Sequence, residues 1–310
     1  MTELAPRKRL APFTRSREAA PRFQMTQRDI EVVRWVHELR FLTARQIHRL
    51  CFEDKPSART WCEQRLKVLF HHGYLGRVPK PSFGLGAPLA VYCLESKGRD
   101  LVAELQDVGR REVYWERFDN KRGYLFLEHT LALNDLRINI HLACENLGYE
   151  LLEWQDERML RSRAMKDFVD DPAGLGRIPI VPDGWGRVRL ADGRRMAFCV
   201  ELDRGTQDIH PFKRKMRGYL AYWESGAYRR KYETNVLSVL TVVATGNSQR
   251  DRRRVEQLVG WTEEERRWAR PETFTDLFWF CSLAHATPEA VLSEPIWRVA
   301  GRAGEHRLVE

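Results

Sequence analysis

The chain has 310 residues, of which 43% are hydrophobic and ten are tryptophan, so its composition excludes a disordered protein. No apolar run reaches the roughly 18 residues that a membrane-spanning helix needs, and no signal-peptide core is expected at the N-terminus. The net charge of +9 favours a polyanionic partner, nucleic acid ahead of an anionic membrane surface, and the length predicts two domains.

The six cysteines are scattered along the chain and form no Cys-x-x-Cys pair. Their spacing is not that of a structural zinc site. We therefore expect reduced, buried thiols, as is typical of a cytoplasmic protein.

The N-terminal segment is basic and rich in proline. Residues 1–28 carry seven arginines or lysines against two glutamates. This composition predicts a basic disordered arm over residues 1–25, which either contacts a polyanion or remains a solvated tail without contacts.

Residues 26–110 have the pattern of a small helical domain with a β-ribbon. Thr26 is placed to begin a helix, Thr43 and Ser57 are placed to cap the next two helices, and Gly73 is placed to end the last of these. The expected elements are helices over about residues 26–39, 44–51 and 58–71, strands over 74–78 and 89–94 around a Gly/Pro-rich loop at 81–88, and a closing helix over 95–105.

This order of elements predicts a winged helix-turn-helix. In that fold the third helix enters the DNA major groove and the ribbon reaches the phosphate backbone. The alternative use of the same fold is protein contact or dimerisation. The basic side chains that we expect to contact phosphates are Arg59, Arg65 and Lys67 on the third helix, and Arg77 and Lys80 at the ribbon.

A polar stretch over residues 106–123 predicts a linker to a second domain at residues 120–310. The expected elements of that domain are a helix at 125–146, a strand at 150–155, an exposed charged excursion at 158–177, a strand at 178–183, a hairpin connection at 184–193, a strand at 196–203, a helix at 209–225, a strand at 236–244, a helix at 250–259, a strand at 277–283, a short helix at 288–292 and a strand at 296–299. This order predicts an α+β or α/β fold with a mixed sheet flanked by helices, and it matches the core of restriction-endonuclease-like nucleases.

Three acids follow apolar runs in this second domain. Asp183 ends one run, and Glu201 and Asp203 end the next. Alternation along the strand places Glu201 and Asp203 on the same face. Converging carboxylates repel unless a cation or proton neutralises them, and oxygen-rich sites suit Mg²⁺ or Mn²⁺. Alternatively, Asp183 opens a turn with its neighbouring glycine, and the other two acids pair with Arg204 or Arg217.

The motifs around these acids resemble a known family. Pro182-Asp183 followed by Glu201 in the next strand resembles the PD-(D/E)xK nuclease signature. The fuller pattern, Val-Pro-Asp-Gly at 181–184, Glu-Leu-Asp-Arg-Gly-Thr at 201–206 and Lys-Arg-Lys-Met at 213–216, resembles the replication–relaxation family. That family is similar to plasmid mobilisation relaxases with a winged-helix front and a PD-(D/E)xK-type back, and the resemblance extends over about residues 26–300.

The resemblance implies DNA cleavage at a metal site. Asp183 and Glu201 would be catalytic metal ligands, Glu128 would complete the shell, and the ion would be Mg²⁺ or Mn²⁺. The chain departs from the signature at Asp203, an acid of the catalytic cluster that stands where a lysine is expected. Lys215 on the next helix is our first choice to replace that lysine.

Several further residues are alternative members of the site. Lys215, Tyr219 and Tyr222 share one helical face by spacing. Attack by Tyr219 is the alternative to metal-activated water, but the sequence lacks the histidine triad that usually accompanies such chemistry. The remaining minority candidates are His129 and Asp135 in place of Glu128, and Lys213 in place of Lys215.

The sequence thus predicts a cytoplasmic, DNA-binding, metal-dependent DNA nickase or endonuclease that resembles a mobilisation relaxase. Its expected partners are duplex DNA, single-stranded DNA and, in a homodimer, a second copy of the chain. Basic runs at 229–231 and 250–254 either line a DNA track or form a solvated face. The alternative function is a non-catalytic replication initiator or transcription regulator with a degenerate nuclease-like domain, and a genome-defence nuclease is a third option.

Overall fold

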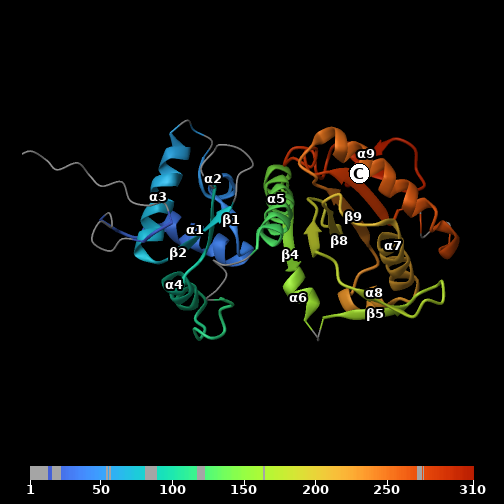
Figure 1. Cartoon of the computed structure of the whole chain (residues 1–310), viewed down its shortest axis with the longest axis horizontal. Helices are drawn as coiled ribbons and strands as arrows, with labels where there is room; N and C mark the ends of the chain where they lie inside the picture. Colours follow the sequence, from blue (N-terminus) through green and yellow to red (C-terminus); the bar gives the residue numbers. More distant parts are fainter. Residues whose placement is uncertain are drawn as a thin grey trace, which may run out of the picture. The chain divides into compact units, whose positions relative to one another are not determined.

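The computed structural model of the chain separates into two compact units, Met1–Asn134 and Asp135–Glu310 (Figure 1). The structure describes residues 13–15, 22–53, 55, 57–80, 89–116, 123–162, 165–270, 274 and 276–310. Most of the predicted basic arm, the predicted loop at 81–88 and the end of the predicted linker lie outside the described residues. The division between the units falls within helix α5 (Tyr124–Leu147), and each unit is described by itself.

The first unit contains helices and a small antiparallel sheet at the predicted positions. Its sheet has the strand order β1-β3-β2. The elements are α1 (Gln27–Leu39), β1 (Leu42–Thr43), α2 (Ala44–Cys51), α3 (Ala58–His72), β2 (Leu75–Lys80), β3 (Leu89–Leu94) and α4 (Ser96–Gln106). The predicted helices and strands of this region are thereby confirmed, within one or two residues at their ends.

Local capping explains where these helices begin and end. Thr26 and Thr43 each form a capping box, with Asp29 and Gln46 respectively. Gly73 ends α3 in the left-handed conformation at φ 83°, which only glycine adopts without a steric penalty. Ser57 occupies the predicted cap of α3, but its side chain makes no capping hydrogen bond, so that part of the prediction is wrong.

The N-terminal half of α5 completes the core of the first unit. Leu127 and Leu131 pack with Phe41 and with buried residues of β2 and β3. The Asn134 amide donates hydrogen bonds to the backbone oxygens of Leu39 (2.9 Å) and Phe41 (2.7 Å). Because a buried amide needs partners, these bonds hold this part of the helix in a defined position on the unit.

The second unit is built on a seven-stranded mixed sheet with the order β12-β11-β10-β9-β8-β7-β4. Strands β8, β9 and β10 are parallel, and their other neighbours are antiparallel. Its elements are β4 (Glu150–Asp156), α6 (Glu157–Arg161), β5 (Asp167–Asp170), β6 (Arg177–Ile180), β7 (Gly184–Arg189), β8 (Arg195–Asp203), α7 (Ile209–Glu224), α8 (Ala227–Tyr232), β9 (Ser238–Val243), α9 (Ser248–Glu263), β10 (Phe278–Ser282), β11 (Trp297–Val299) and β12 (Glu305–His306). The predicted mixed sheet flanked by helices is confirmed.

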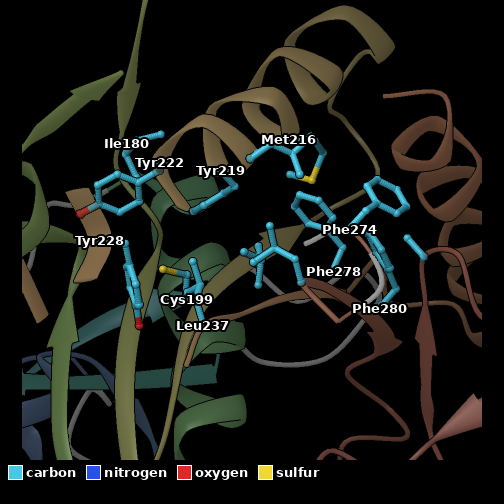
Figure 2. Close-up of a cluster of buried hydrophobic side chains, with 14 of the residues drawn as sticks. Ile180, Cys199, Met216, Tyr219, Tyr222, Tyr228, Leu237, Phe274, Phe278 and Phe280 are labelled. Atoms are coloured by element: carbon cyan, nitrogen blue, oxygen red, sulfur yellow. The ribbon is translucent and has the colours of Figure 1, made fainter. Parts of the chain in front are cut away.

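The main core of the second unit lies between helices α7 to α9 and one face of this sheet. Figure 2 shows Met216, Tyr219 and Tyr222 of α7 in one cluster with Cys199 of β8 and with Phe278 and Phe280 of β10. All of these side chains are buried. Burial of this apolar area fixes α7 on the sheet and thereby fixes which of its polar side chains reach the strand ends.

Two predictions between residues 158 and 193 are wrong. The excursion at 158–177 is not simply exposed: it contains α6 and β5, and Asp171 is buried. The expected strand at 178–183 is the short β6, which pairs with β5 in a separate two-stranded sheet. The β5–β6 hairpin packs on α7 at Gly218, where an added Cβ would lie 2.8 Å from Ile178.

The strand that replaces it in the large sheet is β7, within the expected hairpin connection at 184–193. Its glycines hid it from the sequence pattern, because glycine is a weak strand former. A Cβ at Gly186 would lie 2.7 Å from the Phe198 ring, so close packing requires glycine there. Gly193 lies in the turn between β7 and β8, with φ 84°. The predicted helix at 288–292 is a series of turns, and α8 and β12 were not predicted.

No helix among the described residues is both long enough and apolar enough to cross a membrane.

Candidate active site at the end of β8

Asp183 lies immediately before β7 and beside β8. Its backbone N–H donates to the Val200 carbonyl (3.0 Å), and its Oδ2 accepts from the Leu202 N–H (2.8 Å). Gly184 pairs with Val200, so Asp183 extends the ladder to the level of Glu201. The two acids that the sequence placed at neighbouring strand ends are therefore adjacent across the sheet, although Asp183 precedes a strand instead of ending one.

Glu201 is the buried centre of this arrangement. Only 4% of the residue is exposed, and its carboxylate accepts from the Lys215 ammonium (2.6 Å) and the Tyr219 hydroxyl (2.5 Å). Burial raises the pKa of Glu201, and the charge of Asp183 adds to that rise, while Lys215 and Tyr219 oppose it. The net upward shift shows that Lys215 and Tyr219 do not fully offset the effect of burial on the Glu201 carboxylate.

The pKa of Lys215 is also shifted upward. Burial lowers its pKa, but the carboxylates of Glu201 and Asp183 raise it by more, so the net pKa shift is upward. Both shifts favour retention of a proton at the site. A group of residues that holds protons in this way also favours any other positive charge, including a metal cation.

Tyr219 keeps its proton. Burial, together with the nearby charge of Glu201, raises the pKa of its hydroxyl well above the ordinary value, and this hydroxyl donates to Glu201. Lys215 and Tyr219 lie one helical turn apart on α7 and contact the same carboxylate, whereas Tyr222 donates to Asp167 of β5. The side chains on the predicted shared face of α7 thus contact two different acids, Glu201 and Asp167.

Asp203 points to a different partner. It is 3% exposed, and Arg254 of α9 binds it in a bidentate manner, with Nε–Oδ1 and Nη2–Oδ2 distances of 3.0 and 2.9 Å. The Gly205 N–H donates to the same carboxylate (2.7 Å). The sequence had suggested Arg204 or Arg217 as the pairing arginine, and Arg254, fifty-one residues further along the chain, was missed.

Two of the alternative site residues, Lys213 and Glu128, have other partners. Lys213 pairs with Glu264 at the end of α9. Glu128 belongs to the first unit, where it lies 3.2 Å from the Lys80 ammonium and accepts from the Tyr124 hydroxyl (2.5 Å). His129 follows it in the first unit, and Asp135 is the first residue of the second unit.

The basic residues predicted to bind phosphates fall into two groups. Arg59 has a side chain that is 83% exposed, and Lys67 is also exposed on α3. In contrast, Arg65 forms an ion pair with the buried Asp29, and Lys80 pairs with Glu128. Arg77 stacks on the rings of Phe70 and Tyr92, at 4.5 and 5.3 Å from their centroids.

The structure also brings Glu157 to the site, a residue that the sequence analysis missed. A carboxylate oxygen of Glu157 and one of Asp183 lie within 4.8 Å of each other. Glu157 directly follows β4, and its neighbour Asp156 pairs with Gly184. A correct assignment of β7 would have revealed it, because the register β4–β7 sets Glu157 beside Asp183.

The chain also has a clear relationship to a known protein family. Residues 33–237 match the model of the family described as replication-relaxation, which is more than half of the 310 residues. The chain belongs to the replication-relaxation family. No curated protein matches it. Among solved structures it is similar to the restriction endonuclease FokI, with 11% sequence identity and a TM-score of 0.29, over 84% of this chain and 42% of that chain.

Proposed function

We propose that this protein is a DNA-binding, metal-dependent endonuclease that nicks DNA in the manner of a mobilisation relaxase. Membership of the replication-relaxation family supports a role in DNA processing. The observation that carries the proposal is the pairing of Lys215 with the buried Glu201, at 2.6 Å, beside Asp183. Lys215 here takes the place of the signature lysine whose position along β8 is occupied by Asp203.

The donor set fits a hard divalent cation. Asp183 and Glu201 offer carboxylate oxygens, the ligands that Mg²⁺ and Mn²⁺ prefer. A carboxylate oxygen that accepts one hydrogen bond keeps a further lone pair, so the bonds from Lys215 and Tyr219 do not exhaust Glu201. When bound, such an ion polarises the scissile phosphate and lowers the pKa of a water molecule. The role of Glu128 as a further ligand stays a prediction.

The residues of the chain would divide the remaining tasks. Lys215, protonated and a third exposed, would stabilise negative charge on a phosphate oxygen at the edge of the site. Tyr219 would hold the Glu201 carboxylate in place, and the Leu202 N–H would orient Asp183. Because the raised pKa of Tyr219 disfavours its phenolate, we propose attack by water in preference to attack by this tyrosine.

For the first unit we propose a winged helix that binds duplex DNA. The order α1, α2, α3 and the β2–β3 ribbon supports this proposal. Arg59 and Lys67 are the best-placed phosphate contacts, since both are exposed on α3. Arg65 and Lys80 would contribute less, because each already pairs with an acid of its own unit.

A second candidate function is supported by Asp203. Its carboxylate fills the position of the signature lysine and is fixed by Arg254. Such a substitution is compatible with a replication initiator or transcription regulator whose nuclease-like unit binds DNA or a partner without cutting.

Incubation of supercoiled plasmid with the protein and Mg²⁺ or Mn²⁺ tests the proposal. We expect open-circular product from the wild type, and loss of that product from Asp183→Ala, Glu201→Ala and Lys215→Met. Lys213→Met is the matched control, since it removes a lysine from the same helix that pairs with Glu264. Nicking that survives the Asp183 and Glu201 substitutions would exclude this site, and DNA binding by a wild type that never nicks would favour the regulator.

A further inference from the structure

The β5–β6 hairpin of the second unit has an inner face and an outer face. On the inner face, Val169, Ile178 and Ile180 are buried and belong to the main core of the unit. The outer face carries Phe168 and its register partner Pro179, and both residues are exposed, Phe168 by 45%. Strand alternation thus presents an aromatic ring to solvent, on a hairpin whose inner face already supplies the apolar packing.

Two cations lie against this ring. The Lys166 ammonium is 5.2 Å and the Arg177 guanidinium 5.1 Å from the ring centroid, and both residues are exposed. Arg214 of α7 donates to the Arg177 carbonyl (2.8 Å); its side chain is 42% exposed and lies 3.7 Å from the buried Asp171. One exposed acid, Asp170, is opposite Arg177 in register. These exposed cations outnumber the exposed acid that the structure describes here, which favours an anionic partner.

An aromatic plane flanked by cations has the chemistry that binds a nucleic-acid strand with unpaired bases. A base can stack on the ring of Phe168 while the cations contact the adjacent phosphates. Cation–π contacts at exposed sites are weaker than base–aromatic stacking, so a base displaces one cation from the ring, and that cation remains beside the phosphates. The bases of a duplex must first be unpaired and unstacked to reach such a ring, so the ring selects a single strand.

The ring also lies close to the candidate active site. Pro179, opposite Phe168, precedes Asp183 by four residues, so their Cα atoms are no more than about 14 Å apart. Asp167, the neighbour of Phe168, accepts a hydrogen bond from Tyr222, on the same helix as the active-site lysine. A strand whose base stacks on this ring therefore has its neighbouring phosphodiesters within reach of the active-site acids.

We propose that the outer face of the β5–β6 hairpin binds a single DNA strand, with an unpaired base stacked on Phe168 and the adjacent phosphates held by Lys166 and Arg177. This inference rests on the proposed function and deepens it, because it assigns the surface that holds the strand beside the candidate active site. It is a separate surface from α3 of the first unit, which is proposed to bind duplex DNA.

Fluorescence anisotropy of a labelled oligothymidine strand with the full-length protein tests this surface, in EDTA so that no metal-dependent cleavage occurs. Phe168→Leu keeps an apolar side chain but removes the aromatic plane, and it should weaken binding by about tenfold. Phe168→Tyr keeps the plane and should bind like the wild type. Leu175→Ala is the matched control, since Leu175 is a 66% exposed apolar residue of the same hairpin without a ring, and it should also bind like the wild type.

A strand of the same length with abasic sites in place of every base separates stacking from phosphate contacts. This strand should bind the wild type and Phe168→Leu equally. In contrast, Lys166→Gln and Arg177→Gln should weaken the binding of both strands, and each should reduce the slope of log affinity against log salt concentration by about 0.7, as expected for one lost phosphate contact.

The outcomes separate this surface from the endonuclease. Wild-type affinity of Phe168→Leu for oligothymidine, or an equal loss with the abasic strand, would overturn the stacking role, while plasmid nicking that requires Asp183 and Glu201 would leave the proposed function intact. Loss of strand binding in Phe168→Leu, in a protein whose wild type never nicks, would support this surface and overturn the endonuclease. Thermal unfolding checks that each variant is folded, and Phe168→Met, with the same expected loss, replaces Phe168→Leu should that variant be unfolded.

Discussion

Helix α7 binds buried acids in two clusters, and the pKa shifts of Asp171 in one and Glu201 in the other are opposite. Arg217 pairs with Asp171 (2.8 Å) and Glu265 (2.9 Å), and its hydrogen bond to Asp171 lowers the pKa of that acid. Lys215, two residues earlier, pairs with Glu201, whose pKa is raised by burial and by Asp183. We call these the Arg217 cluster (Asp171, Arg217, Glu265) and the Lys215 cluster (Glu201, Lys215, Tyr219).

The difference distinguishes a structural ion pair from a candidate binding site. In the Arg217 cluster, guanidinium donors satisfy the Asp171 carboxylate at both oxygens, so that acid is stabilised in its charged form. In the Lys215 cluster, the buried Glu201 lies beside Asp183, and the bonds from one ammonium and one hydroxyl do not fully offset the effect of burial on its pKa. Burial alone does not mark a functional acid, whereas incomplete compensation of its charge does.

The largest expected effect is on stability, and it tests the Arg217 cluster. Arg217→Met leaves two buried acids without their cation and should lower the free energy of unfolding by about 3–5 kcal/mol. Arg214→Met is the matched control: Arg214 lies 3.7 Å from Asp171, but its side chain is 42% exposed, so its loss should cost about 1 kcal/mol or less. Urea unfolding followed by circular dichroism measures both, and equal losses would refute the structural role of Arg217.

The next effect is on activity, and it tests the Lys215 cluster. Lys215→Met should reduce nicking by about 10²-fold or more, as expected for loss of a group that stabilises transition-state charge. Its effect on unfolding should be smaller than that of Arg217→Met, because Glu201 can take up a proton in place of the lost cation. A Lys215→Met protein that nicks normally but unfolds as readily as Arg217→Met would reverse the comparison.

The pH dependence of stability should differ between the two acids. Asp171, with a pKa lowered from 3.8, stabilises the fold above that value, and this contribution is lost as the pH falls through its folded pKa. Glu201, with a pKa raised from 4.5, contributes stability below that value, and this contribution is lost as the pH rises through its folded pKa. Glu201→Gln should therefore remove a decline in stability above pH 4.5.

Unfolding midpoints in urea, measured across this pH range for the wild type and Glu201→Gln, check this prediction. Saturating Mn²⁺ should flatten the same decline in the wild type, since a cation lowers the pKa of the acids around it. An unchanged decline in Glu201→Gln would show that another group titrates there.

The sequence predicted those parts of the site that local patterns determine. Alternation in Met196–Asp203 correctly placed Glu201 and Asp203 on a strand, and helical spacing correctly brought Lys215 to it. The partner of Asp203 could not be predicted, because nothing near it in the sequence indicates Arg254 of α9. Glycine-rich β7 was missed, since its strand conformation comes from packing under Phe198 and not from local preference.

The smallest expected effect concerns Thr241, at the border between structure and function. Its hydroxyl has no hydrogen-bond partner within the described part of the chain and lies among the buried residues Val239 and Val243, so Thr241→Val should raise the free energy of unfolding by about 1 kcal/mol. The same substitution should weaken nicking, because the hydroxyl would then no longer hold an oxygen beside Glu201. A gain in stability together with a loss of nicking would assign Thr241 to the same site as the Lys215 cluster, where hydrogen bonds and charges do not fully offset the cost of burying a polar group. Thermal unfolding and plasmid nicking measure the two effects, and a gain in stability without any loss of nicking would leave Thr241 outside the site.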